Sequence, residues 1–269
     1  MTTTNEQPAG AAVPVIEAKE LGHRYGDRQI FQNLDFSIAA GEFVCLVGPS
    51  GVGKTTLLQI LTGLMMPTDG EVDFQQNKVV APPEGLAVVF QDYSRSLMPW
   101  LSVIDNVALP LRSAGVKKAE RVRRATEALE EDGLADFTGA YPWQLSGGMQ
   151  QRVAIARALA SGPRAIVMDE PFASVDAQTR SELEDLVLKV RDHLGITVVL
   201  VTHDIDEAIY LADTVLVLSG KPATLTARIE VGLPTPRHQL KTKAEPEFAE
   251  LRTEVYKLIK NKPVAATGS

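Results

Sequence analysis

The stretch "GPSGVGKTT" at positions 48–56 has the residue types of a nucleotide phosphate site. It fits the pattern G-x-x-x-x-G-K-[S/T], follows an apolar run and precedes a helical pattern. Glycines in such a loop let backbone N–H groups close around phosphate oxygens. Lys54 is a predicted catalytic residue whose positive charge can neutralise the β and γ phosphates, and Thr55 is a predicted Mg²⁺ ligand. The predicted nucleotide contacts are Gly48, Pro49, Ser50, Gly51, Val52, Gly53, Lys54, Thr55 and Thr56.

A second glycine turn, "LSGGMQQR" at 145–152, also opens a helical pattern. The first N–H groups of a helix have no partners within the helix, and the positive end of the helix dipole lies beside them. This turn is therefore a second ready-made anion site. Because one nucleotide needs only one phosphate cradle, the second turn needs an explanation of its own.

Two adjacent acids follow the apolar run in "AIVMDEP". Asp169, at the end of a buried strand, is placed to hold the Mg²⁺ shell, which makes it a predicted metal ligand. Successive strand residues face opposite ways, so we expect Pro171 to keep Glu170 extended and to end the strand there. That would free the Glu170 carboxylate to act as the base that positions an attacking water. The alternative for Glu170 is a solvated surface acid.

The elements that must position these groups are four apolar runs that end abruptly in polar residues: "EFVCLVG", "LAVVFQD", "AIVMDEP" and "TVVLVTHD". Runs of this kind are typical of strands buried on both faces of a parallel sheet. Ligands bind beyond the carboxyl ends of such strands. Helical patterns alternate with the runs at roughly 54–63, 117–132, 148–161, 178–194 and 204–211.

Two further polar residues, Gln91 and His203, follow strands of the same predicted sheet. Taken singly, each is more often a structural residue. Because they share an edge with Lys54 and Asp169, we predict that Gln91 joins the Mg²⁺ and water shell and that His203 donates to the γ-phosphate. Tyr25 is a candidate for stacking on a base, with packing in a turn as the alternative.

The fold class predicted is α/β, with a P-loop NTPase core and a mainly parallel sheet. An N-terminal antiparallel β subdomain covers about 15–40 and "GEVDF", and an α-helical subdomain is inserted at about 92–160. Residues 1–14 are expected to be disordered. Residues 233–269 form a tail with a short amphipathic helix whose apolar face is formed by Phe248, Leu251, Val255, Leu258 and Ile259.

Composition excludes several classes of protein. The formal net charge of −7 argues against a nucleic-acid binder. The lone Cys45 rules out an internal disulfide and is expected to be a buried structural thiol. No apolar run approaches the ~18 residues that span a bilayer, so a second chain must hold this protein at any membrane. His23, His193 and His238 have no chemical context and are expected at the surface.

Together these residues resemble the ATP-hydrolysing subunit of ABC (ATP-binding cassette) transporters over about 15–232. Val175 departs mildly from the family, which more often has Ala or Leu before the aspartate of "SVDA". The resemblance is carried by Tyr25, the loop 48–56, Gln91, the turn 145–152, Asp169, Glu170, Ser174–Ala177 and His203.

The resemblance implies an ABC nucleotide-binding domain that works as a head-to-tail dimer with ATP and Mg²⁺ as cofactors. Ser146, Gly147 and Gly148 of one chain would complete the ATP site on the phosphate loop of the other. Gln150 and Asp176 join the nucleotide contacts by the same resemblance. The partner is a second copy of the chain or a paralogous ATPase, and each glycine turn then serves a different nucleotide.

The segment "LMPWLSVIDNVALPLR" at 97–112 resembles importers for nitrate, sulfonates, taurine and related small anions. This implies an importer ATPase at the cytoplasmic face of the inner or plasma membrane, docked on membrane-spanning permease subunits and indirectly on a substrate-binding protein. The alternatives are an ATPase of a lipid or export system and a regulatory cassette that binds ATP without hydrolysing it. The solute itself is not encoded in this chain.

Residues around 91–100 have two interpretations. Leu97 and Trp100 are expected in the core of the helical lobe, whereas Ser96 is expected to be exposed. The alternative for this segment, including Met98 and Pro99, is a groove that receives a short helix of the permease.

Overall fold

A single sheet forms the centre of the molecule. The structure is a computed structural model that describes residues 13–92 and 96–260. The ten strands lie in the order β5-β4-β1-β2-β10-β9-β3-β8-β7-β6. This confirms the predicted α/β fold class. The strands are β1 (Ile16–Tyr25), β2 (Arg28–Ile38), β3 (Phe43–Val47), β4 (Asp69–Phe74), β5 (Asn77–Lys78), β6 (Leu86–Val89), β7 (Ala165–Asp169), β8 (Thr197–Val201), β9 (Thr214–Gly220) and β10 (Ala223–Glu230).

Strands β3, β6, β7, β8 and β9 form the parallel part of the sheet. Every residue of β3, β7 and β8 is buried, as expected for strands covered by helices on both faces. Val44 pairs with Val199, and Asp169 pairs with Val201, so the three strands end at nearly the same level. The segments that follow them therefore meet at one edge of the sheet.

The remaining strands form the antiparallel part, with β1 between β2 and β4. Strand β10 joins the two parts, since it pairs antiparallel with β9 and parallel with β2 at Ala223 and Phe31. The sequence patterns predict the strands β1, β2 and β4, whereas β9 and β10 were not predicted. The apolar run "TVLVLSG" is the signal that would have indicated β9.

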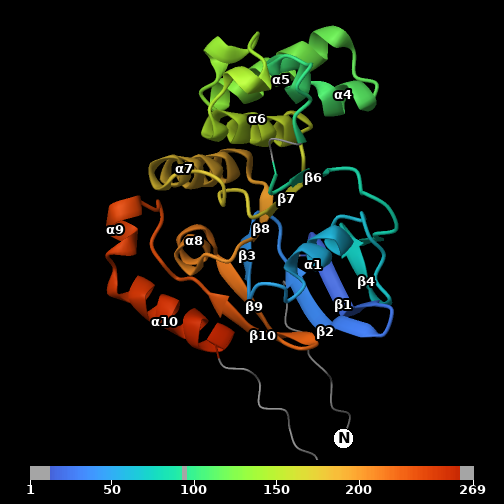
Figure 1. Cartoon of the computed structure of the whole chain (residues 1–269), viewed down its shortest axis with the longest axis vertical. Helices are drawn as coiled ribbons and strands as arrows, with labels where there is room; N and C mark the ends of the chain where they lie inside the picture. The colour runs from blue at the N-terminus through green and yellow to red at the C-terminus, as the bar shows by residue number, and fades with distance from the viewer. Residues whose placement is uncertain (1–12, 93–95, 261–269) are drawn as a thin grey trace, which may run out of the picture.

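The helices lie on both sides of the strands, with α7, α8 and α10 on one side and α1 on the other (Figure 1). No helix within residues 13–92 and 96–260 combines the length and apolarity required to cross a bilayer. The helices are α1 (Lys54–Leu61), α3 (Val103–Val107), α4 (Leu109–Ser113), α5 (Lys118–Glu131), α6 (Gly147–Ala160), α7 (Ala177–Leu194), α8 (Ile205–Leu211), α9 (Gln239–Lys243), α10 (Pro246–Lys260) and the 3₁₀ helices η1 (Ala135–Phe137) and η2 (Pro142–Gln144).

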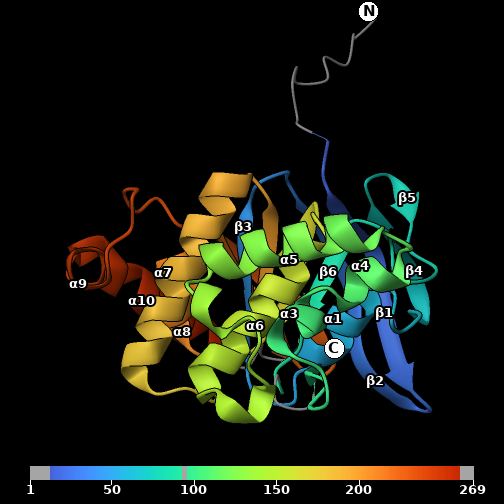
Figure 2. The ribbon, with the colours of Figure 1, turned by 90° about the horizontal axis from the view of Figure 1, so that it is seen from above.

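Helices α3 to α6 gather into a lobe between β6 and β7 in the chain, and they lie together at the front when the molecule is seen from above (Figure 2). The lobe has an apolar core of its own, which includes Leu97, Val103, Leu129 and Val153. Its last helix, α6, also packs on α7 and β6, so the lobe is joined to the sheet. Trp100 was expected in this core, but it is 71% exposed.

The tail after β10 ends in α10, whose Phe248 and Val255 are buried against the core beside β9. Leu251, Leu258 and Ile259 are partly buried against the same core, as the helical periodicity predicts. The predicted disorder at 1–14 falls mostly on residues 1–12, which lie outside the described part of the chain.

One of the three histidines expected at the surface is buried. His23 is only 6% exposed, and its ring makes an edge-to-face contact with Tyr25. It lies on β1 opposite Phe31 of β2, so its burial comes from its place in the sheet and not from a pattern in the neighbouring sequence. Burial lowers the pKa of His23, which favours the neutral imidazole. His193 and His238 are exposed, and Cys45 is buried as expected.

Candidate functional site

The phosphate loop connects the buried strand β3 to α1. Gly53 has a φ of 109°, and a Cβ there would lie 2.5 Å from Ile30 Cγ2. A Cβ at Gly48 would lie 2.5 Å from the carbonyl oxygen of Leu218. Both positions therefore accept only glycine, one for its backbone conformation and both for space. Helix α1 begins without a side-chain cap, which leaves its first N–H groups available to phosphate oxygens.

Lys54 carries a buried positive charge inside this loop. Its Nζ donates to the carbonyl oxygen of Gly48 at 2.8 Å, and the residue is only 6% exposed. Burial lowers the pKa of Lys54, whereas the negative charges of Glu170 and Asp169 act to raise it. The ammonium group is thus held inside the loop, against the Gly48 carbonyl oxygen.

A hollow of about 340 Å³ lies against the loop. Tyr25 stands at its side with 48% of its surface exposed, and the Tyr25 hydroxyl donates to Met65 Sδ. Arg28 also lines the hollow but was missed by the sequence analysis, since nothing except nearness to Tyr25 indicates it. The lining residues are Tyr25, Arg28, Ile30, Ser50, Gly51, Gly53, Lys54, Thr55, Thr56 and Glu170.

The strand ends bring three predicted residues into contact. Gln91 Nε2 donates to Glu170 Oε2 at 3.2 Å. His203 Nδ1 lies 3.1 Å from the same oxygen. Gln91 follows β6, Glu170 follows β7 and His203 follows β8, so three neighbouring strands supply one polar cluster. The convergence expected from the sequence is present.

The backbone at Glu170 differs from the expectation. Glu170 was predicted to be extended before Pro171, but its φ is +42°, in the left-handed region. The Glu170 N–H still donates to the carbonyl oxygen of Val201 at 2.8 Å, so the ladder continues for one residue. Proline disfavours the right-handed helical region in the residue before it, which leaves the left-handed one open. The left-handed turn breaks the strand alternation and leaves Glu170 in contact with His203.

Asp169 is the buried member of the pair of acids, at 6% exposure. Burial raises its pKa, and a hydrogen bond from Thr55 together with the charge of Lys54 opposes that rise. One carboxylate oxygen, Oδ1, is buried without a hydrogen-bond partner. A hydroxyl and a carboxylate with a free oxygen are hard ligands that suit Mg²⁺. Within residues 13–92 and 96–260, no group of three or more His, Cys, Asp or Glu side chains could hold a metal ion.

The signature turn, residues 145–152, is exposed where it opens α6. Ser146 is the N-cap of α6, and its Oγ accepts from the Met149 N–H at 3.3 Å. Ser146 and Gly147 are both exposed to solvent. A Cβ at Gly148 would collide with the Cγ2 methyl of Thr179 on α7, so this glycine is required for helix packing.

Gln150 and Asp176, assigned to the nucleotide by resemblance, are engaged within the chain. Gln150 Nε2 donates to the carbonyl oxygens of Pro142 and Leu145, which fixes the segment before the signature turn. Asp176 is the N-cap of α7 and accepts from Thr179. The hydroxyl and backbone N–H of Thr179 hold the pKa of Asp176 below its ordinary value.

The two glycine turns do not share a hollow within one chain. Of the residues that line the hollow at the phosphate loop, all described, none belongs to the signature turn. The signature turn opens α6 in the helical lobe, whereas the phosphate loop opens α1 beside the sheet (Figure 1). The hollow at the phosphate loop is thus lined without any residue of the signature turn of the same chain.

A second hollow, of about 600 Å³, lies between β6 and the helical lobe. Arg157 donates to the Ser96 carbonyl oxygen at 2.6 Å and to Ser96 Oγ at 2.9 Å, so the expectation of a freely exposed Ser96 was wrong. The hollow is lined by Val88, Phe90, Asp92, Ser96, Met98, Leu109, Pro110, Ser113 and Arg157.

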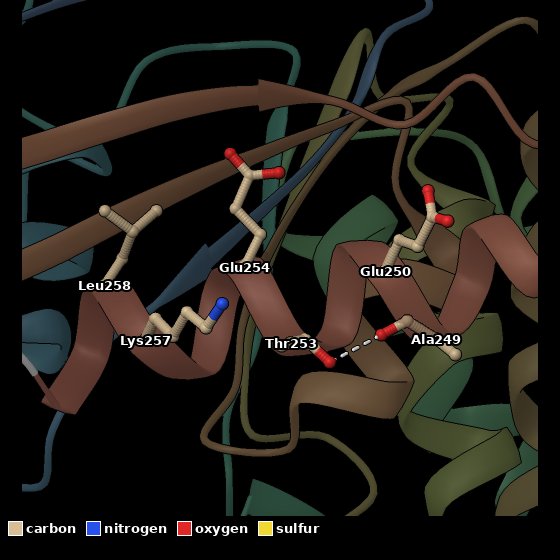
Figure 3. A pocket seen from close by; sticks show the side chains of 6 residues that line it. All are labelled: Ala249, Glu250, Thr253, Glu254, Lys257 and Leu258. Atoms are coloured by element: carbon tan, nitrogen blue, oxygen red, sulfur yellow. Dashed lines mark hydrogen bonds between the residues drawn. The ribbon is translucent and has the colours of Figure 1, made fainter.

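A third hollow, of about 610 Å³, runs along α10 at the opposite end of the molecule. It is lined by Ala249, Glu250, Thr253, Glu254, Lys257 and Leu258, and the Thr253 hydroxyl donates to the Ala249 carbonyl oxygen within it (Figure 3). None of these residues belongs to the phosphate loop or the strand ends, so this hollow is separate from the candidate site.

Comparisons with known proteins agree with this geometry. Residues 31–173 match the family described as "ABC transporter". The nitrate import ATP-binding protein NrtD of Synechocystis sp. is 40% identical over 88% of this chain and 90% of its own length. The taurine import ATP-binding protein TauB of Rhizobium johnstonii is 43% identical over 86% of this chain and 90% of its own. The solved dimer of the cassette MJ0796, in a post-hydrolysis state with ADP and Pi, matches with a TM-score of 0.70 and 34% identity over 80% of this chain and 98% of that one.

Proposed function

This chain belongs to the ABC transporter family of ATP-binding proteins, and we propose that it is the ATPase subunit of an importer for a small anion such as nitrate, taurine or a sulfonate. As a member of that family it is an ATP-binding ATPase. The import role is supported by the names of relatives that match most of the chain, NrtD and TauB. The resemblance of segment 97–112 to importers of this branch supports the same role.

The convergence of Gln91, Glu170 and His203 carries the proposal for hydrolysis. Glu170 lines the hollow at the phosphate loop, so its carboxylate can accept the proton of a water that attacks the γ-phosphate. His203 holds Glu170 from one side and donates to the γ-phosphate, while Gln91 orients the water. Lys54 neutralises charge that develops on the phosphates.

Tyr25 stacks on the adenine in this proposal, because it stands exposed at the side of the same hollow. Thr55 and Asp169 would hold Mg²⁺, joined by Gln91, and the free Oδ1 of Asp169 supports this assignment. Mg²⁺ would supply charge neutralisation at the β and γ phosphates.

The ATP site is completed in a head-to-tail dimer with a second copy or a paralogous ATPase. Two observations support this: the signature turn is exposed, and it contributes nothing to the hollow at its own phosphate loop. Ser146, Gly147 and Gly148 then face the γ-phosphate bound to the partner, since free N–H groups of a helix start bind anions. ATP would join the two chains and hydrolysis would release them.

The hollow of about 600 Å³ between β6 and the lobe is the proposed dock for a permease helix. The permease would hold the chain peripherally at the cytoplasmic face of the membrane and connect it indirectly to a substrate-binding protein. We propose an ATPase domain at 15–232, with the lobe inserted at about 92–160, followed by a tail at 233–269. A cassette that does not hydrolyse ATP is disfavoured, because the chain has all four of Lys54, Asp169, Glu170 and His203.

The substitution Glu170→Gln tests the proposed hydrolysis. The amide keeps the shape of Glu170 but removes the base, so we expect ATP binding to persist and turnover to fall by at least about 100-fold. Trapped ATP should then hold a dimer that is visible in sizing experiments. Near-normal turnover in this variant would mean that Glu170 is a solvated surface acid, and the proposed mechanism would be wrong.

A further inference from the structure

A small cavity lies behind the contact between Glu170 and His203. Its volume is about 40 Å³ and its lining is mostly polar side chains. A water needs only about 10–15 Å³ of such space and two or more polar partners, so the cavity is large enough to hold water. Glu170 lines both this cavity and the hollow at the phosphate loop. The cavity is lined by Glu170, Ala173, Arg180, Thr202, His203, Asp204 and Glu207.

Glu207, in the first turn of α8, is the buried acid of this cavity, with 6% of its surface exposed. Its Oε2 accepts from Thr202 Oγ1 at 3.1 Å. The same hydroxyl accepts from the Asp204 N–H at 3.0 Å, so its only proton points to Glu207. The other carboxyl oxygen of Glu207, Oε1, is buried without a hydrogen-bond partner. A proton on this side chain therefore belongs on Oε1.

The surroundings favour the protonated acid. Burial, followed by the negative charges of Glu184 and Asp204, raises the pKa of Glu207 to about 8. The hydrogen bond from Thr202 and then the charge of Arg180, whose guanidinium lies 3.5 Å from Asp204, oppose this rise. Glu184 is itself held by Gln239 and Lys243 of the tail.

The other groups near Glu207 do not neutralise it. Cys45 of β3 faces it, but burial raises the pKa of that thiol, so it stays uncharged. Glu170 and His203 line the same cavity. At neutral pH Glu207 is thus a neutral acid with one O–H donor next to a polar cavity.

We propose that Glu207 is a positioning residue for ATP hydrolysis: its Oε1–H donates to water in the cavity, and this water supports Glu170 and His203 from the side opposite the nucleotide. The proposal rests on the proposed role of Glu170 as the base. Glu170 Oε2 is already held by Gln91 and His203, and the cavity water restrains the remaining freedom of the carboxylate.

Ionisation of Glu207 would reverse this effect. The donor on Oε1 would be lost, and a second negative charge would stand behind Glu170 and near the phosphates. ATP turnover should therefore decline as the pH rises past the point where Glu207 loses its proton. A merely structural acid in the same place would not link turnover to its own protonation.

The test is the steady-state ATP turnover of the full-length wild type, Glu207→Gln and Glu207→Leu between about pH 6 and about pH 10. Wild-type turnover should fall through the pKa of Glu207, about 8. The Gln variant keeps a donor but cannot ionise, so the fall at this pH should be absent, even if its rate is reduced. The Leu variant loses the donor, and we expect a drop of about tenfold at neutral pH.

Asp132→Asn is the matched control. Asp132 lies just after α5, and burial raises its pKa to about 8 as well, but it does not line the cavity. This variant should keep the wild-type pH profile. Lys54, whose pKa burial lowers, is present in all variants and cannot cause a difference between them.

Infrared difference spectroscopy gives a readout that does not depend on turnover. Between about pH 7 and about pH 9, the wild type and Asp132→Asn should lose a protonated carboxyl band of Glu207 that Glu207→Gln never has. The band of Asp132 falls in the same pH range, but it is absent only from Asp132→Asn, so comparing the two variants with the wild type assigns each band. Identical pH profiles for the wild type and Glu207→Gln, or the absence of this Glu207 band, would overturn the proposal. Unimpaired turnover in Glu170→Gln would instead overturn the proposed function while leaving the Glu207 band in place.

Discussion

The phosphate loop and the signature turn both place glycines at the start of a helix, yet their surroundings differ. The phosphate loop encloses a buried lysine, Lys54, and lies beside Asp169 and Glu170. The signature turn is exposed at Ser146 and Gly147, and none of its residues lines the hollow at the phosphate loop. A glycine turn beside a cation and carboxylates can hold a nucleotide, whereas the signature turn offers N–H groups at a helix start. This difference agrees with the proposal that the signature turn is one half of a site.

The two helix starts differ in the same direction. Helix α1 has no side-chain cap, so all its first N–H groups are available to a phosphate. Helix α6 is capped by Ser146, which already satisfies the Met149 N–H. Fewer N–H groups remain for an anion at α6. This agrees with a supporting contact to one phosphate and not with a complete cradle.

The largest difference is expected when each turn is disabled separately in the isolated chain. Lys54→Ala removes charge-assisted hydrogen bonds to phosphate and should weaken ATP binding by about 10- to 100-fold. Ser146→Arg alters a turn that the isolated chain does not use for its own nucleotide, so its ATP affinity should stay within about twofold of wild type. Calorimetric titration of the two isolated variants measures both. Equal losses of affinity would mean that the two turns serve the same nucleotide within one chain.

A smaller effect is expected when a glycine of each turn is replaced by alanine, because the two turns require glycine for different reasons. Gly148→Ala would push a methyl group into Thr179 Cγ2 and, by overpacking, should lower the free energy of unfolding by about 1–3 kcal/mol. Thr179→Ser removes that methyl but keeps the hydroxyl that donates to Asp176, so the double variant should recover most of the loss.

Denaturant unfolding of the two single variants and the double variant gives this coupling. Gly51 in the phosphate loop is the contrasting position, because a Cβ there meets nothing within 4 Å and only its φ of +74° resists substitution. Adding Thr179→Ser should therefore recover none of the stability lost in Gly51→Ala. Additive losses for Gly148→Ala and Thr179→Ser would refute the packing explanation.

Most of the candidate site was predictable because it follows from strand ends. The four apolar runs become neighbouring parallel strands, so Gln91, Glu170 and His203 meet at one edge without any information beyond their positions. The backbone of Glu170 was not predictable, because Pro171 favours an extended residue before it and the left-handed conformation found here departs from that preference. The roles assigned to these residues stay predictions.

The predictions from sequence that were wrong concern the burial or exposure of residues, which depends on contacts in three dimensions. His23 is buried by its place on β1, and Trp100 is exposed although its neighbour Leu97 is in the core. Ser96 is held by Arg157, which lies far away in the sequence. Strand β10 joins the two parts of the sheet through a single aligned pair, a contact that no local pattern indicates.

The most direct measurement of the central claim is the nucleotide trapped by a mixed dimer of Lys54→Ala and Ser146→Arg chains that both also carry Glu170→Gln. If the site is shared between chains, one interface of the mixed dimer combines both defects and the other has an intact Lys54 and an intact Ser146. Verified mixed dimers should then trap ATP at one site each, whereas dimers of either variant alone trap none. Complete absence of trapped ATP in the mixed dimers would contradict the shared site, and the signature turn would need another function.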